Sequence, residues 1–202
     1  MNKKIIIIGA GGHGKVCAEI AGFIGYEEIV FLDDNINRPS GFTISGTTAD
    51  YEKFIGGDFF VALGDNRLRR MFQEKIIGSG GSMAKLIHPR AIVSKATAIG
   101  EGSVVMAGAV INPGAVIGDG AIINTCSSVD HDCRIGDFAH IAVGTHLAGL
   151  VSVGENTFIG AGSTVVNTVS IPRDTIVGAG AAVIKSLPCP GTYVGVPARR
   201  IK

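Results

Sequence analysis

The 202-residue chain has no tryptophan, few aromatic residues and little charge of either sign. Its formal net charge is +1, so neither a nucleic acid nor a membrane surface is expected as a partner. No apolar run is long enough to cross a bilayer, and glycines from Gly9 onward interrupt the signal-peptide-like isoleucines after Lys4. The four cysteines form no Cys-x-x-Cys pair, which predicts free thiols in a reducing cytoplasm.

What the chain does have is an apolar residue at every sixth position across half of its length. Helices do not repeat at six and ordinary strands repeat at two, whereas a six-residue period of branched residues is typical of a parallel β-helix. Each position holds Ile, Val or Leu. The positions are Ile87, Val93, Ile99, Val105, Ile111, Ile117, Ile123, Val129, Ile135, Ile141, Leu147, Val153, Ile159, Val165, Ile171, Val177 and Val183.

Two further periods accompany this six-residue repeat. The residue two places before each apolar position is nearly always small, as at Ala121, Ser127 and Cys133, which suits a tight corner between flat sheets. A glycine followed by an acid recurs every eighteen residues, so each coil is expected to hold three strands and three turns. We expect these glycines to supply turn dihedrals that other residues reach only with strain. They are Gly100, Gly118, Gly136 and Gly154.

The front third of the chain lacks the repeat and alternates strands with helices. Buried strands are predicted at Ile5–Ile8, Glu28–Asp33 and Phe59–Leu63, with a helix after the first and a basic helix after the third. This order predicts a βαβ unit with a parallel sheet. The chain is therefore expected to comprise a Rossmann-like α/β domain over residues 1–82 and an all-β solenoid with a C-terminal tail over residues 83–202.

The loop after the first strand is rich in glycine. Gly9, Gly11 and Gly14 fit the dinucleotide pattern G-x-G-x-x-G, with an acid about 20 residues on. A dinucleotide needs two mononucleotide-binding halves, and one half fits before the solenoid begins. A nucleotide-sugar, with its phosphates at the helix N-terminus, is the better match. The alternative is a loop that merely turns a strand into a helix.

The solenoid also carries histidines. His131 follows an apolar position by two and lies between Asp130 and Asp132, so it is expected at a turn, where a carboxylate would raise its basicity as a general base requires. The alternative is a solvated turn histidine. His140 and His146 are six apart and fall on successive faces, which argues against a shared metal site within one subunit. A zinc site between subunits remains an alternative, although no H-E-x-x-H or cysteine pair supports a metal.

Five segments occur together with the repeat: Gly9–Gly14, Phe31–Asp34, Ala62–Asn66, Asn124–Asp132 and Tyr193–Arg199. In this combination the chain resembles the sialic-acid O-acetyltransferase family of hexapeptide-repeat acyltransferases, and more narrowly its bacterial UDP-4-amino-sugar N-acetyltransferases of the bacillosamine type. The resemblance implies a left-handed β-helix, against the usual right-handed crossover preference. It also implies a homotrimer with acetyl-CoA bound between neighbouring subunits.

The resemblance assigns roles to particular residues. His131 matches the family's catalytic base and Asp132 the acid beside it, although the bacillosamine-type enzymes carry Glu there, which leaves open whether Asp130 or Asp132 contacts the imidazole. The acetyl-CoA contacts are matched by His140, Gly149, Ala161 and Ala179. The nucleotide-sugar contacts are matched by Gly12, His13, Gly14, Asp33, Asp34 and Gly64.

The function implied is an acetyl-CoA-dependent N-acetyltransferase acting on the 4-amino group of a UDP-linked amino-deoxy sugar in the cytoplasm, without a metal. His131 would deprotonate the amine, which attacks the thioester directly, with Gly149 as a donor to the oxyanion. One alternative is O-acetylation of a sialic acid or related sugar, which the nucleotide loop disfavours. Another is a non-catalytic nucleotide-sugar-binding trimer, against which the flanked His131 argues.

Overall fold

The computed structural model describes residues 3–37 and 41–202, and the chain divides into two compact units, Met1–Pro89 and Arg90–Lys202. The sequence predicted a division between residues 82 and 83. Strand β5 (Ser82–Met83) pairs in parallel with a strand of the front sheet, so that sheet continues past this point. Strand β6 (Leu86–Ile87) also precedes the division.

The front unit is built on a five-stranded parallel sheet in the order β3-β2-β1-β4-β5. Its other strands are β1 (Lys4–Ile8), β2 (Glu28–Leu32), β3 (Ile44–Gly46) and β4 (Asp58–Val61). Its helices are α1 (Gly12–Phe23), the 3-10 segment η1 (Thr48–Phe54) and α2 (Asn66–Gly78). The sequence predicted β1, β2, β4 and both α-helices, and it missed β3, η1 and β5.

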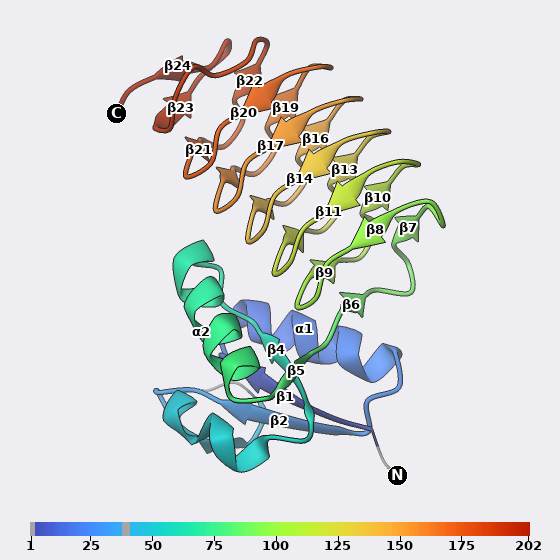
Figure 1. The fold of residues 1–202 in the computed structure, drawn as a ribbon, viewed down its shortest axis with the longest axis vertical. Helices are drawn as coiled ribbons and strands as arrows, with labels where there is room; N and C mark the ends of the chain where they lie inside the picture. Colours follow the sequence, from blue (N-terminus) through green and yellow to red (C-terminus); the bar gives the residue numbers. More distant parts are fainter. Residues whose placement is uncertain (1–2, 38–40) are drawn as a thin grey trace. The chain divides into compact units, whose positions relative to one another are not determined.

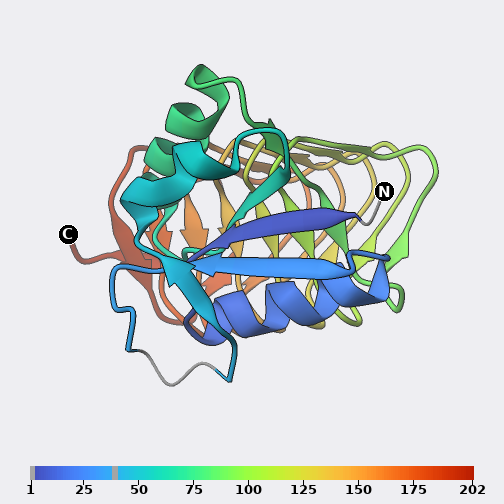
Figure 2. The ribbon, with the colours of Figure 1, turned by 90° about the horizontal axis from the view of Figure 1, so that it is seen from below.

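Helices cover both faces of this sheet. Figure 2 shows α1 (blue) on one face and η1 (teal) with α2 (green) on the other. Ile6 and Ile8 pack with Phe59, Ile76 and their neighbours into one core cluster. Because successive strand residues point to opposite faces, the run of isoleucines in β1 serves both faces, and all four are fully buried. A strand buried on both sides explains why this segment reads as continuously apolar.

The second unit is a left-handed parallel β-helix (Figure 1): the six-residue repeat predicted the β-helix, and the family resemblance implied its hand. All seventeen repeat positions, including Ile87 of β6, are the second residue of a two-residue strand. The strands are β7 (Ile92–Val93), β8 (Ala98–Ile99), β9 (Val104–Val105), β10 (Val110–Ile111), β11 (Val116–Ile117), β12 (Ile122–Ile123), β13 (Ser128–Val129), β14 (Arg134–Ile135), β15 (His140–Ile141), β16 (His146–Leu147), β17 (Ser152–Val153), β18 (Phe158–Ile159), β19 (Thr164–Val165), β20 (Ser170–Ile171), β21 (Ile176–Val177) and β22 (Ala182–Val183).

Three sheets form the faces of the coil. We call them face A (β7-β10-β13-β16-β19-β22), face B (β8-β11-β14-β17-β20) and face C (β9-β12-β15-β18-β21). Face C is extended by a hairpin that the sequence did not reveal, β23 (Thr192–Val194) and β24 (Arg199–Arg200). Partners within each face are 18 residues apart, as at Ile123 and Ile141, so the predicted three-strand coil is confirmed.

The interior of the coil is apolar and its corners are hydrogen-bonded. From Val105 to Val183 the repeat positions are at most 3% exposed. The small residues at the corners are buried from Ser103 to Ala181, and several donate a hydrogen bond to the carbonyl fifteen residues on. Thr145 Oγ1 donates to Gly160 O at 3.0 Å, for example. A buried hydroxyl is thereby satisfied in the turn of the following coil.

The periodic glycines serve a different purpose from the one predicted. Gly136 and its equivalents do not have positive φ, so the expectation that they supply unusual turn dihedrals was wrong. A Cβ on Gly136 would lie 2.5 Å from Glu155 N and 2.9 Å from Gly154 C of the next coil, so close backbone approach requires the glycine. The left-handed residue of each such turn comes two places later, as at Phe138 and Asn156.

Two further properties concern the whole chain. Within residues 3–37 and 41–202, no helix combines the length and apolar character that spanning a bilayer requires. The four cysteines carry free thiols, as predicted; Cys17 and Cys133 are buried and Cys126 is exposed.

Candidate active site

His131 lies on the turn from face A to face B, between β13 and β14. Its Nδ1 is 2.9 Å from Asp132 Oδ2. Since the carboxylate can only accept, Nδ1 carries the proton and Nε2 is left with its lone pair. The hydrogen bond to Asp132 is the main cause that raises the pKa of His131, with smaller contributions from the charges of both flanking acids. Both side chains are more than half exposed, so the imidazole is a solvent-accessible base.

Asp130 holds the backbone rather than the ring. Its Oδ1 accepts hydrogen bonds from the backbone N–H of His131 and from Asn112 Nδ2, each at 2.7 Å. These bonds, the one from Asn112 first, lower the pKa of the Asp130 carboxyl. The contact that the sequence left open between the two acids is therefore made by Asp132. Sequence reasoning missed Asn112, although it lies 18 residues before Asp130 and hence directly beside it in the preceding coil.

The backbone at Asp132 explains how a short acid reaches the preceding ring. Asp132 has φ 57°, in the left-handed region that Asp and Asn tolerate better than most residues. In the preceding coil Gly114 occupies the equivalent position, and a Cβ there would collide with Asp132 Oδ1. The carboxylate thus has one oxygen on the imidazole and the other against a glycine that leaves space for it.

Gly149 lies under the imidazole in the next coil. A Cβ on Gly149 would lie 2.7 Å from His131 Cε1, 3.0 Å from Cδ2 and closer still to Nε2. The same two turns are joined by a hydrogen bond from Leu150 N to His131 O at 2.9 Å. Three of the residues singled out from the sequence, His131, Asp132 and Gly149, are therefore brought together at one corner.

The other residues matched to acetyl-CoA contacts lie at a different corner. His140 is on β15 of face C, where Asn124 Nδ2 donates to its Nε2 at 3.1 Å and its ring stands edge-on to Phe158. Ala161 and Ala179 occupy successive coils on the turn from face C to face A, and both are exposed. A single chain does not bring these residues to His131, because face A separates the two corners.

The remaining coil histidine is held within face A. His146 Nδ1 lies 2.9 Å from Ser128 Oγ, the neighbouring strand's residue. His140 and His146 fall on successive faces, as predicted. Over the described residues, the structure contains no group of three or more His, Cys, Asp or Glu that could hold a metal ion.

In the front unit, the predicted glycine loop connects β1 to α1. Gly9 has φ 100°, and a Cβ on Gly14 would collide with Gly9 O, so both positions need glycine. Helix α1 begins at Gly12 after Gly11, with no side-chain cap. Its first N–H groups therefore have no side-chain acceptor at the N-cap, an arrangement suited to binding an anion.

The two acids after β2 anchor this loop and its surroundings. Asp33 is buried; its Oδ2 accepts from Ala10 N and its Oδ1 from Asn35 N, each at 2.8 Å. Asp34 Oδ1 accepts from both the backbone N–H and the hydroxyl of Thr48, at 2.9 and 2.8 Å. Asp33 thus orders the backbone of the glycine loop and Asp34 holds the start of η1, roles that sequence reasoning did not assign to them.

The loops after β1 and β4 meet at the edge of the sheet. Ala62 N donates to Ile8 O at 2.8 Å, and a Cβ on Gly9 would lie 2.9 Å from Leu63 Cδ2. The strand order reverses between β1 and β4, and ligands of parallel sheets bind outside the carboxyl ends of strands at such a switch point. The segments Gly12–Gly14 and Ala62–Gly64 both lead away from this point.

His13 is partly buried at the start of α1. Burial, reinforced by the positive charge of Arg69, lowers its pKa to about 4, so the imidazole is neutral at pH 7. Its Nε2 is 3.8 Å from Cys17 Sγ. A neutral histidine beside a helix N-terminus can donate to or accept from a ligand without adding charge.

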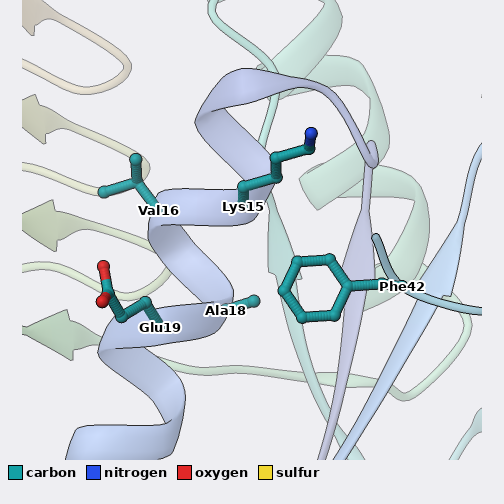
Figure 3. A pocket seen from close by; sticks show the side chains of 5 residues that line it. All are labelled: Lys15, Val16, Ala18, Glu19 and Phe42. Carbon is teal, nitrogen blue, oxygen red and sulfur yellow. The ribbon is translucent and has the colours of Figure 1, made fainter. Parts of the chain in front are cut away.

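A shallow hollow of about 470 Å³ lies beside α1, lined by Lys15, Val16, Ala18, Glu19 and Phe42. Figure 3 shows the Phe42 ring facing the helix, with Ala18 directed toward the ring and Lys15 extending away from it. The hollow contains none of the residues matched to ligand contacts.

The front unit and the whole chain both match known proteins. Residues 4–76 match the model of the PglD N-terminal domain. UDP-N-acetylbacillosamine N-acetyltransferase of Bacillus subtilis (strain 168) is 38% identical over 112 residues, which is 52% of this chain and 52% of that protein. The matched part thus spans about half the length of this curated relative.

Two solved structures match over the full chain. The acetyltransferase domain of PglB from Neisseria gonorrhoeae FA1090, in complex with acetyl coenzyme A, is 42% identical with a TM-score of 0.94, and the match covers 100% of both chains. PerB from Caulobacter crescentus, in complex with CoA and GDP-perosamine, is 41% identical with a TM-score of 0.92, covering 100% of this chain and 99% of PerB.

Proposed function

Since the chain belongs to the hexapeptide-repeat family of bacterial sugar N-acetyltransferases, we propose that it transfers the acetyl group of acetyl-CoA to the 4-amino group of a UDP-linked amino-deoxy sugar. One observation carries the proposal. An exposed imidazole is oriented by Asp132, with its unprotonated Nε2 over Gly149. The relatives bind or act on acetyl-CoA, CoA and nucleotide-linked amino sugars, which supports this choice of substrates.

His131 acts as the general base. A sugar ammonium loses one proton to solvent and becomes a nucleophilic amine, whose nitrogen attacks the thioester carbonyl carbon. His131 Nε2 accepts one of the two N–H protons of this amine as the C–N bond forms, and the other stays on the amide, while Asp132 stabilises the imidazolium. The tetrahedral oxyanion is stabilised by the N–H of Gly149, and collapse breaks the C–S bond. The imidazolium returns its proton to the departing CoA thiolate, which balances the reaction without a metal or an enzyme nucleophile.

The front unit binds the nucleotide-sugar. We assign the phosphates to the N-terminus of α1 at Gly12–Gly14, with Gly64 on the facing loop. Asp33 and Asp34 contribute by ordering the loops, in addition to any contact with the ligand. The four free thiols agree with a reaction in a reducing cytoplasm.

The working form is a homotrimer. Acetyl-CoA is held by His140, Ala161 and Ala179 at one corner of the coil, whereas His131 is at another. The site would be complete if the corner of one subunit that carries His140 packed against the corner of the next subunit that carries His131. The division of the predicted contacts between two corners supports this assembly.

The test is acetyl transfer followed by thiol release, with UDP-4-amino and GDP-4-amino sugars as acceptors and sedimentation equilibrium on the same sample. We expect turnover on the UDP-4-amino sugar by a trimer, and a loss of 10²–10⁴-fold in His131→Ala with an unchanged thermal melt. Activity on a free hydroxyl sugar alone would support O-acetylation instead. Nucleotide binding without any turnover would leave a non-catalytic binding trimer, and a stable monomer would contradict the assembly.

A further inference from the structure

A buried cation lies behind the loop that faces the glycine loop. Arg69 of α2 is 0% exposed and is among the largest fully buried side chains of the described residues. Its Nη1 donates to Leu63 O and its Nη2 to Asn66 Oδ1, each at 2.8 Å, with a longer bond from Nη1 to Gly64 O. The guanidinium therefore binds neutral oxygens along one turn and fixes its path.

Burying this charge has a cost. Burial lowers the pKa of Arg69 to about 10, and the nearby carboxylate of Asp65 offsets part of that effect. Asp65 itself caps α2, accepting from Arg67 N and Leu68 N at 2.9 Å. A neutral side chain could donate to carbonyl groups without the desolvation of a full charge. The retained charge therefore points to a use beyond holding the turn.

The charge is placed where an anion would feel it. The turn that Arg69 fixes packs against the glycine loop, with Leu63 Cδ2 at Gly9. At the start of α1, the same guanidinium adds to burial in disfavouring the protonated form of His13. The positive potential of Arg69 opposes a second cation at the start of α1 and therefore favours an anion there. This potential adds to that of the positive end of the helix dipole.

We propose that Arg69 is the buried cation of the nucleotide-sugar site: it holds the Leu63–Asn66 turn in place, and its charge strengthens binding of the substrate's diphosphate at the N-terminus of α1. Because the side chain is fully enclosed, Arg69 acts as a positioning residue and through its field, without touching the ligand. The inference rests on the proposed function, since it takes the front unit as the nucleotide-sugar site.

The two roles of Arg69 can be separated by a series of ligands that differ in charge. Uridine, UMP and UDP are titrated by calorimetry into the wild type, Arg69→Met and Arg69→Lys. We expect Arg69→Met to weaken UDP binding on the order of tenfold, as a unit charge acting through partly buried surroundings would, while uridine binding changes less than twofold. Arg69→Lys keeps the charge and should retain most of the increase in binding affinity from uridine to UDP.

Asn66→Ala is the matched control. It removes one acceptor of the guanidinium and keeps the charge. The ratio of UDP affinity to uridine affinity should therefore be unchanged, even if the affinities for uridine, UMP and UDP all fall together. Titration of the His13 imidazole by NMR gives a second readout. Its pKa should rise from about 4 in Arg69→Met, because the opposing charge is gone, and stay low in Asn66→Ala.

Acetyl-CoA binding and a thermal melt on each variant report whether the chain is folded. If Arg69→Met does not fold, Arg69→Gln and Arg69→Lys give the same comparison. Equal weakening of uridine and UDP, or an unchanged His13 titration in the folded neutral variant, would overturn the inference and leave Arg69 a structural residue. A wild type that binds neither UDP nor GDP would instead refute the proposed function itself.

Discussion

Replacing Gly149 by alanine would test the position of the proposed base without disturbing the coil. The new Cβ would lie 2.7 Å from His131 Cε1, whereas carbon atoms in ordinary contact are about 3.5–4.0 Å apart. The ring must therefore move by roughly 1 Å. A displacement of this size can lower a rate by about 10²-fold, which is the loss in kcat/KM that we expect.

Stability should hardly change in this variant. Gly149 does not have positive φ, so alanine adds no backbone strain. The group that must give way is a side chain about half exposed to solvent, which can rotate outward. The loss of backbone freedom in the unfolded chain favours alanine by about 0.4–1 kcal/mol, so the free energy of unfolding should stay within about 1 kcal/mol of the wild type.

The assay is thiol release under steady-state conditions, with urea unfolding on the same preparations. Gly22→Ala is the matched control, because a Cβ there meets open space. If Gly149→Ala acts through His131, adding it to His131→Ala should change the residual rate less than twofold, since the two changes remove the same contribution. Gly149→Ala with kcat/KM within threefold of the wild type would refute the reasoning, because alanine keeps the backbone N–H and removes only the space.

Two other changes test the site and the coil. Asp132→Asn removes the hydrogen-bonding charge that is the first cause of the raised pKa of His131, so the imidazole should stay unprotonated to lower pH; the acidic limb of the kcat/KM profile should move to lower pH and the plateau should fall, and an unmoved limb would exclude His131 as the titrating base. Thr145→Val removes one of the two hydrogen bonds that Gly160 O accepts, the other coming from Ser163 N at 3.2 Å. It should lower the free energy of unfolding by about 0.5–1.5 kcal/mol in urea, whereas the exposed Thr164→Val should change it little.

The solenoid could be predicted from the sequence because each coil repeats the same physical demand. One branched residue in six fills the interior, and one small residue in six fits the corner, so seventeen turns of the pattern specify register as well as fold. The hairpin of β23 and β24 escaped prediction because Thr192–Val194 and Arg199–Arg200 lie past the repeat. In the front unit β3 and β5 are short, and pairing with longer neighbours stabilises them more than their own composition does.

The candidate site was predictable where it depends on neighbours in sequence. Asp132 lies beside His131, and both acids could be singled out from spacing. The choice between Asp130 and Asp132 depends on the left-handed φ of Asp132. A sequence does not reveal such a φ at a residue other than glycine. The contribution of Asn112 comes from stacking of coils, and that of Arg69 from a fold in which α2 reaches the turn after β4. Residues of this kind are identified only once the contacts between distant parts of the chain are known.

The eighteen-residue period also determines which insertions and deletions the coil can accept. Adding or removing eighteen residues lengthens or shortens the β-helix by one coil, and every later side chain stays on its original face. Removing six residues preserves the apolar repeat, but it moves every later strand to the neighbouring face. A deletion of six residues between His131 and Gly149 would bring a different turn under the imidazole, so a chain that still folds would have lost its catalytic alignment.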